Sequence, residues 1–157
     1  MVRKKAFRQN PLTDKGSMYI MNNMVIEQKL KLSLKDVPGL VEGILEKMES
    51  LGIYNDIPME LRLAIEEALT NAVKHGNKLD PDKNVSIRVE TFPGSVQIEV
   101  EDEGAGFDHG KVPLPTDDEN IWKTSGRGVF LIRHFMDKAE YSQGGRRLKL
   151  CKCLKPK

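Results

Sequence analysis

The sequence lacks several features that assign a protein to a specialised class. No apolar run approaches the roughly 20 residues that a membrane-spanning helix needs. The basic N-terminus is not followed by the apolar stretch and small-residue cleavage site of a secretory signal. We therefore expect a cytoplasmic protein without a membrane segment.

Cysteine is scarce, because the 157 residues include only two, Cys151 and Cys153. Two thiols cannot form the disulfide framework of a small secreted domain. If their segment is a strand, both side chains lie on one face, but two ligands without a nearby histidine make a poor zinc site. Reduced structural thiols are the expected interpretation.

Charge is distributed unevenly along the chain. Residues 1–15 carry five lysines and arginines against one aspartate, residues 144–157 carry six basic residues and no acidic one, and the segment between them is acidic. Basic ends can contact nucleic acid. These ends lack interleaved aromatic residues, so we expect solvated tails and no direct nucleic-acid binding.

The length and composition suit one domain. Hydrophobic residues make up 39% of the chain and charged residues 31%, as in a globular protein with a proper core. Residues 1–23 show no clean periodicity and resemble a flexible basic arm. We therefore expect a single domain over residues 24–157.

Hydrophobic periodicity predicts a strand and two helices in the first half of this domain. From Met24 the apolar residues alternate as in a half-buried strand. The inward set is Ile26, Leu30, Leu32 and Leu34. Ser33 or Asp36 can cap a helix that stops at Gly52. The next helix covers residues 58–75, with a proline at its first position and a glycine after its last.

The second half combines strands, a long loop and a helix. The segments are strands over 84–92 and 95–101, a polar surface loop over 107–125, a helix over 126–138, and strands over 139–143 and 146–153. Pro93-Gly94 and Gly144-Gly145 supply the hairpin turns. This order indicates an α+β fold, a two-layer sandwich whose mixed, mostly antiparallel sheet carries helices on one face.

Glu67 and Asn71 form the first candidate site. They are four residues apart, so they lie on one face of the second predicted helix, at the edge of its core stripe. An asparagine amide oxygen is a hard ligand of the kind that Mg²⁺ accepts. A carboxylate one turn away could accept a proton from a nucleophile that approaches a phosphate. The alternative is a pair of solvated polar residues.

The segment from Asp102 to Gly106 reads Asp-Glu-Gly-Ala-Gly, ends a predicted strand and opens the long loop. Glycines at 104 and 106 let the backbone approach a flat ligand or adopt a positive φ. A carboxylate can accept a hydrogen bond from the exocyclic amine of adenine, where guanine has a carbonyl, so Asp102 could select adenine. A plain acidic turn is the alternative, and EF-hand spacing does not fit.

The segment from Thr124 to Val129 reads Thr-Ser-Gly-Arg-Gly-Val and stands at a predicted helix start. A glycine-rich turn at a helix N-terminus offers free N–H groups and the positive end of the helix dipole to a phosphate. A Walker lysine motif and a dinucleotide fingerprint after a first strand are both absent from the sequence.

The order and context of these three motifs resemble the GHKL ATPases, the superfamily of histidine kinases, gyrase, the heat-shock chaperone and mismatch-repair ATPases. Within it, residues 67–75 look like the N-box of the anti-sigma-factor serine/threonine-protein kinases. Residues 125–133 and Met136-Asp137 look like their last glycine box. The resemblance covers about residues 24–154.

This resemblance implies a Bergerat pocket that binds ATP and Mg²⁺ under a flexible lid at 107–125. Glu67 would be the catalytic base, Asn71 the Mg²⁺ ligand through its side-chain oxygen, and Asp102 the adenine contact. The other expected nucleotide-binding residues are Lys74, His75, Gly104, Gly106, Phe107, Thr124, Ser125, Gly126, Arg127, Gly128 and Val129. For His75, a helix-capping role is the alternative. Members phosphorylate a STAS-type anti-anti-sigma partner, sequester a sigma factor and are commonly homodimers.

Two positions depart from the family pattern. Some relatives have an arginine before the Ser-Gly of the last box, where this chain has Thr124; many have a threonine after the final-hairpin glycine, where this chain has Arg146. The sequence predicts a serine/threonine-protein kinase of a partner-switching pathway. Two alternatives stay open: a non-catalytic ATP-binding module that sequesters a regulator, and a free-standing ATPase domain of histidine-kinase type.

Overall fold

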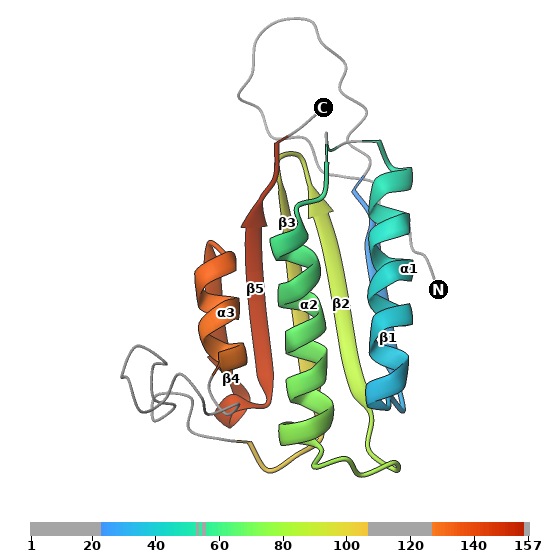
Figure 1. The fold of residues 1–157 in the computed structure, drawn as a ribbon, viewed down its shortest axis with the longest axis vertical. Coiled ribbons are helices and arrows are strands. Elements are labelled where there is room, and N and C mark those ends of the chain that lie inside the picture. Colours follow the sequence, from blue (N-terminus) through green and yellow to red (C-terminus); the bar gives the residue numbers. More distant parts are fainter. Residues whose placement is uncertain (1–22, 53, 55, 107–126, 156–157) are drawn as a thin grey trace, which may run out of the picture.

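The computed structural model describes residues 23–52, 54, 56–106 and 127–155 of the chain. Within them, the α-helices cover one face of a five-stranded sheet (Figure 1). The helices are α1 (Val37–Ser50), α2 (Met59–Asn71) and α3 (Arg127–Phe135), and the strands are β1 (Val25–Leu30), β2 (Val85–Phe92), β3 (Ser95–Asp102), β4 (Lys138–Ser142) and β5 (Arg147–Cys153). The two-layer α+β sandwich expected from the sequence is confirmed.

The strand order is β1-β2-β3-β5-β4, and every neighbouring pair is antiparallel. The sheet in the described part of the chain is therefore antiparallel rather than mixed. β3 and β4 run in the same direction, as strands joined through a helix commonly do. They are not neighbours, because β5 returns between them.

The core lies between the sheet and the helices. Side chains of β2 and β3 alternate strictly between buried and half-buried positions, as the period of two predicts. The buried set meets an apolar stripe of α2; its members are Val85, Ile87, Val89, Val96, Ile98 and Val100 from the sheet and Leu61, Ile65 and Leu69 from the helix. The outer face of the sheet carries cross-strand ion pairs, among them Arg147–Glu101 and Lys149–Glu99.

The connection between β1 and α1 differs from the prediction. β1 ends at Leu30, and Leu34, expected to point inward from the strand, lies in a 3-10 turn with 41% of its surface exposed. The cause is local: Asp36 accepts a hydrogen bond from the backbone N–H of Ser33 at 3.2 Å, which starts a turn before α1. The predicted stop of α1 is confirmed, because Gly52 has a φ of +63°.

The ends of α2 also differ in detail. Pro58 caps the helix rather than occupying its first position. The predicted helix to His75 is α-helical only as far as Asn71, and Ala72–Gly76 form a π-helical turn in which the N–H of Asn77 donates to Ala72 at 2.8 Å. π-turns inside helices are frequent at functional sites, and this one carries the last part of the first motif.

The last helix is shorter than predicted. α3 ends at Phe135 instead of Lys138, because the N–H of Asp137 already donates to the carbonyl of Cys151 at 3.0 Å and leads the chain into β4. The predicted loop at 107–125 lies outside the described residues, as does the N-terminal arm up to residue 22. None of the helices in the described ranges has the length and apolar character required to cross a membrane.

Candidate functional site

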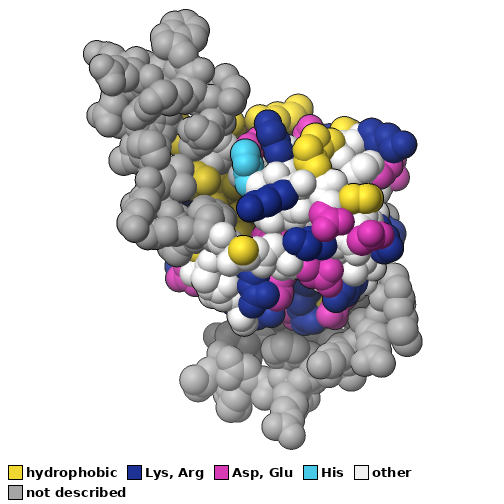
Figure 2. Space-filling model, turned by 90° about the horizontal axis from the view of Figure 1, so that it is seen from below, with side chains coloured by type: hydrophobic (Ala, Val, Ile, Leu, Met, Phe, Trp, Pro, Cys, Tyr) yellow, Lys and Arg dark blue, Asp and Glu magenta, His cyan; other side chains and the backbone are white. Residues whose placement is uncertain are grey.

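The residues of the sequence motifs converge on the C-terminal half of α2. α2 and β3 end together at the lower edge of the molecule, and α3 starts beside α2 (Figure 1). Figure 2 looks onto this lower edge, where basic and acidic side chains are interspersed without a large area of one sign. The described side chains on this face therefore create no strong field of one sign.

Asp102 is the last residue of β3 and is 7% exposed. Its carboxylate accepts a hydrogen bond from the N–H of Gly104 at 2.8 Å, and its own N–H donates to the carbonyl of Arg146 at 3.1 Å. Burial raises the pKa of the Asp102 carboxyl, and the Gly104 N–H and the charge of Arg146 oppose that rise. The result is a fixed, partly desolvated acceptor at the end of a central strand.

Two glycines allow the backbone to close around this carboxylate. A Cβ atom at Gly76 would stand 2.3 Å from the carboxyl carbon of Asp102, and a Cβ atom at Gly104 would stand 2.0 Å from the carbonyl oxygen of Gly76. Neither position has room for a side chain. The π-helical end of α2 and the turn after β3 are thus packed backbone to backbone, with the Asp102 side chain between them.

The hairpin between β4 and β5 lies close to the turn that follows β3. Gly106 has a φ of +84°, and a Cβ atom there would stand 2.1 Å from the carbonyl oxygen of Gly144. The chain leaving β3 therefore crosses closely over the turn between β4 and β5. This hairpin also carries Arg146, whose carbonyl accepts from the N–H of Asp102.

Glu67 lies half-buried on α2, and its carboxylate faces the start of α3. A Cβ atom at Gly128 would stand 2.5 Å from the carboxyl carbon of Glu67. The glycine of the third motif is therefore what allows the side chain from the first motif to reach this place. Glu67 and Gly128, which are 61 residues apart in sequence (128 − 67), therefore share one site.

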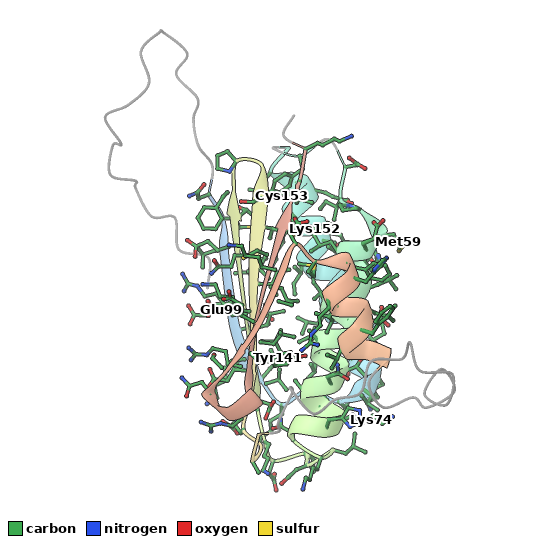
Figure 3. All side chains as sticks on the ribbon, turned by 90° about the vertical axis from the view of Figure 1, so that its left-hand side faces the viewer. Met59, Lys74, Glu99, Tyr141, Lys152 and Cys153 are labelled. Carbon is green, nitrogen blue, oxygen red and sulfur yellow. The ribbon has the colours of Figure 1, made fainter. Side chains whose placement is uncertain are left out.

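Tyr141, on β4, interacts electrostatically with Glu67. It faces the helix layer from the edge strand and packs against the core (Figure 3). Burial and the negative charge of Glu67 raise the pKa of the Tyr141 hydroxyl, while the positive charge of Arg133 lowers it. The Glu67 carboxylate therefore lies against the start of α3, and its charge is felt by a hydroxyl group of the edge strand.

The remaining predicted residues fall into three groups. Asn71 is half-buried at the end of α2, one turn beyond Glu67, and the half-buried Val129 lies in α3. Lys74 and His75 are exposed on the π-helical turn, with Lys74 at the open lower end in Figure 3. The others, Phe107, Thr124, Ser125, Gly126 and the side chain of Arg127, lie outside the described residues.

Sequence reasoning missed part of this site. The sequence predicts only a helix stop at Gly76, whereas its backbone also lies against Asp102. The sequence motifs include neither Asn77 nor Tyr141, although one is a buried amide beside the acidic turn and the other interacts electrostatically with Glu67. The only sequence signal for Asn77 was its place directly after a helix that carries a motif.

Asn71 offers an oxygen donor of the kind that Mg²⁺ accepts. The described residues contain no cluster of three or more His, Cys, Asp or Glu side chains that would hold a metal ion alone. Mg²⁺ commonly takes one or two protein oxygens and completes its shell with water and phosphate. The Asn71 amide and the glycine-lined surroundings of Asp102 and Glu67 fit that pattern.

Comparison with known proteins agrees with the site geometry. Residues 32–152 match the family model described as the histidine kinase-like ATPase domain, a range that includes all three motifs. A serine-protein kinase RsbW of Staphylococcus aureus is 34% identical over 113 residues, covering 65% of this chain and 69% of the relative. The serine-protein kinase RsbW of Staphylococcus epidermidis is 32% identical over 110 residues with the same coverage.

Proposed function

This chain belongs to the histidine kinase-like ATPase domain family, and we propose that it is an ATP-dependent serine/threonine-protein kinase. Its substrate is a STAS-type anti-anti-sigma protein, and it regulates a sigma factor by exchanging one partner for the other in the cytoplasm, as a homodimer. The relatives named serine-protein kinase RsbW support this choice within the family.

The observation that carries the proposal is the placement of two carboxylates along α2. Asp102 is fixed at the end of the helix, beneath two glycines, and Glu67 is held one turn before Asn71 against the start of α3. A nucleotide whose base meets Asp102 would direct its phosphates toward the N-terminus of α3, where free N–H groups and the helix dipole favour anions. Glu67 would then lie on the phosphate side of the site.

Each residue has a role in the transfer. Asp102 accepts a hydrogen bond from the exocyclic amine of adenine, and Asn71 supplies the amide oxygen for Mg²⁺, which offsets phosphate charge when it is bound. The serine hydroxyl oxygen of the partner attacks the γ-phosphorus as its proton passes to the Glu67 carboxylate. The bond between the γ-phosphorus and the bridging oxygen breaks, and ADP leaves.

The test is transfer of γ-labelled phosphate from ATP-Mg²⁺ to purified STAS-domain proteins, with nucleotide affinity measured in parallel. Glu67→Gln should abolish transfer and keep ADP binding, because the amide cannot accept the proton but preserves the shape of the side chain. Label that survives acid is on serine or threonine, whereas acid-labile label is on histidine and would favour the histidine-kinase type instead.

A second candidate is a non-catalytic module that binds ATP and sequesters a regulator. The departures at Thr124 and Arg146 favour the non-catalytic module. At these positions, some of the kinases that the sequence resembles have residues that lie near the nucleotide. Tight ATP binding without transfer to any STAS-domain partner, combined with nucleotide-dependent capture of a sigma factor, would support this candidate over the kinase.

A further inference from the structure

Asn77 is a buried polar residue that links three segments beside Asp102, the proposed adenine contact. It follows the π-helical turn and is 2% exposed. Its side-chain amide donates to the carbonyl of Asn84 at 2.9 Å, its side-chain oxygen accepts from the N–H of Glu103 at 2.9 Å, and its own N–H donates to Ala72 at 2.8 Å. The end of α2, the start of β2 and the turn after β3 are thus joined at one side chain.

The hydrogen bond from the Glu103 N–H to Asn77 restrains the backbone of Asp102. The N–H of Glu103 belongs to the peptide group that follows Asp102, and the N–H of Asp102 belongs to the peptide group that precedes it. The first is held by Asn77 and the second by the carbonyl of Arg146. With both flanking peptide groups fixed, the backbone of Asp102 has little freedom, and the close approach of Gly76 restricts its side chain in turn.

An asparagine suits this position because the two contacts require opposite groups. The Asn84 carbonyl needs a donor and the Glu103 N–H needs an acceptor, and an amide supplies both from one short side chain. A buried amide without partners would be costly, so these two bonds also satisfy Asn77 itself. Replacing Asn77 would leave the Glu103 N–H without its acceptor, directly beside the proposed adenine contact Asp102.

The same turn is also held by the Glu103 side chain, through interactions that are exposed to solvent. The Glu103 carboxylate accepts from the N–H of Asn84 at 2.8 Å and pairs with Lys29 at 2.8 Å. These donors lower the pKa of the Glu103 carboxyl to about 2, so it is ionised at neutral pH. The Lys29 and Glu103 side chains are 60% and 41% exposed, and pairs of that exposure contribute little.

We propose that Asn77 is a positioning residue that sets the orientation of the Asp102 carboxylate and thereby the preference for adenine over a 6-oxopurine base. This inference rests on the proposed contact between Asp102 and adenine. The base preference of the site would then depend in part on a residue outside the three motifs, which contacts the acidic turn through the Glu103 N–H.

The experiment compares the binding of ADP and inosine diphosphate, which carries a carbonyl where adenine has its amine, by isothermal titration calorimetry. The wild-type chain should prefer ADP, and Asp102→Asn should remove the preference. Asn77→Ala should weaken ADP binding about tenfold and inosine diphosphate binding less than about threefold. Glu103→Ala, which removes the exposed interactions of that side chain, and Lys31→Ala, which removes an exposed ion pair with Asp82 at 3.5 Å, should keep the wild-type ratio.

Asn77→Asp provides a rescue, because a carboxylate still accepts from the Glu103 N–H. It should restore part of the ADP preference even where its unfolding free energy is lower than that of the wild type. If Asn77→Ala does not fold, Asn77→Ser takes its place with the same expected loss, since a hydroxyl is too short to span both partners.

The outcomes separate the two proposals. If the wild-type chain does not distinguish the two nucleotides, the proposed contact of Asp102 with adenine fails. If the wild type prefers ADP and Asn77→Ala weakens both nucleotides equally, Asn77 only stabilises the fold, and this inference is overturned while the role of Asp102 stands.

Discussion

The carboxylate of Glu67 on α2 lies directly against the backbone of Gly128 at the start of α3, so that a Cβ atom at position 128 would stand 1.8 Å from Oε1 of Glu67. The atom in the way belongs to the end of a flexible side chain and not to the backbone. A side chain at 128 would therefore displace the carboxylate and leave the helices in place. The position of Glu67 depends on the absence of a side chain at 128.

Gly128→Ala should separate catalysis from stability. We expect phosphate transfer to fall about 100-fold, because a displacement of about 1 Å in a reacting group can cost that much. The free energy of unfolding without nucleotide should change by less than about 1 kcal/mol, since alanine favours the helix. The measurements are a transfer assay and urea denaturation of the same variant.

Gly43→Ala is the matched control for Gly128→Ala. It lies in α1, where an added Cβ would meet nothing within 4 Å. It should gain about 0.5–1 kcal/mol of stability from helix propensity and keep full transfer. Transfer by Gly128→Ala within twofold of the wild type would show that the carboxylate does not need this position.

Gly104→Ala should reduce stability as well as nucleotide binding. Its Cβ would stand 2.0 Å from the carbonyl oxygen of Gly76 and 2.6 Å from the carbonyl carbon, both backbone atoms that cannot rotate away. The turn and the end of α2 must separate, so we expect a loss of about 1–3 kcal/mol in unfolding free energy. Calorimetric titration should detect no ADP binding. A stable variant with normal ADP affinity would contradict the close packing of these two segments.

Asp102→Asn should bind nucleotide poorly and yet be the more stable protein at neutral pH. Burial raises the pKa of the Asp102 carboxyl above its ordinary value of 3.8, so the folded state favours the protonated form. The stability that Asp102 contributes is therefore fully present below pH 3.8 and declines as the pH rises through the raised pKa of the folded state. Asparagine carries no charge at any pH and avoids the decline, while its side-chain oxygen can still accept from Gly104.

Urea denaturation from pH 4 to pH 7 checks this expectation. The difference between Asp102→Asn and the wild type should favour the variant at pH 7 and shrink toward pH 4, where the wild-type carboxyl becomes protonated. A variant that is less stable than the wild type at pH 7, with an unchanged denaturant slope, would mean that the carboxylate stabilises the empty site.

Local patterns predicted most of the fold. α1 and the β2–β3 hairpin follow from apolar spacing and from turn residues that act within a few positions, and both were placed to within one or two residues. The end of α2 was not predictable in this way. Ala72–Gly76 can continue an α-helix by propensity, and the π-turn there accompanies contacts with the β3 turn, which is distant in sequence.

The same distinction applies to the candidate site. Glu67, Asn71 and Asp102 stand in short motifs and could be named from the sequence, although their roles stay predictions. Asn77 joins the turn after β3 through Glu103, 26 residues away, and Tyr141 interacts with Glu67 on another element, so no local pattern marks either residue. The place of β5 between β3 and β4 has the same origin, because strand order is a property of the assembled sheet.

Tyr54 should give the protein a stability loss at high pH that is separate from the site. Its side chain is 6% exposed, and its hydroxyl lies 2.8 Å from the carbonyl oxygen of Ser95 and 3.1 Å from that of Phe92, at the far end of β2 and β3 from Asp102 (Figure 1). Burial raises the pKa of the Tyr54 hydroxyl to about 12 from an ordinary value of 10.0. The folded state therefore favours the neutral phenol, and this contribution is complete below pH 10 and lost as the pH rises toward 12.

Tyr54→Phe tests this contribution, because the other titrating groups are common to both proteins. At pH 8 the variant should be less stable by about 1 kcal/mol through loss of the hydroxyl hydrogen bond. Between pH 10 and pH 12 the difference in urea midpoint should diminish, since the wild-type phenol ionises at a cost that phenylalanine does not have. ADP affinity should be the same in both proteins at pH 8, because the hairpin end is remote from the proposed nucleotide site. A constant difference in midpoint across that pH range would show that the Tyr54 hydroxyl titrates no differently in the folded and unfolded chains.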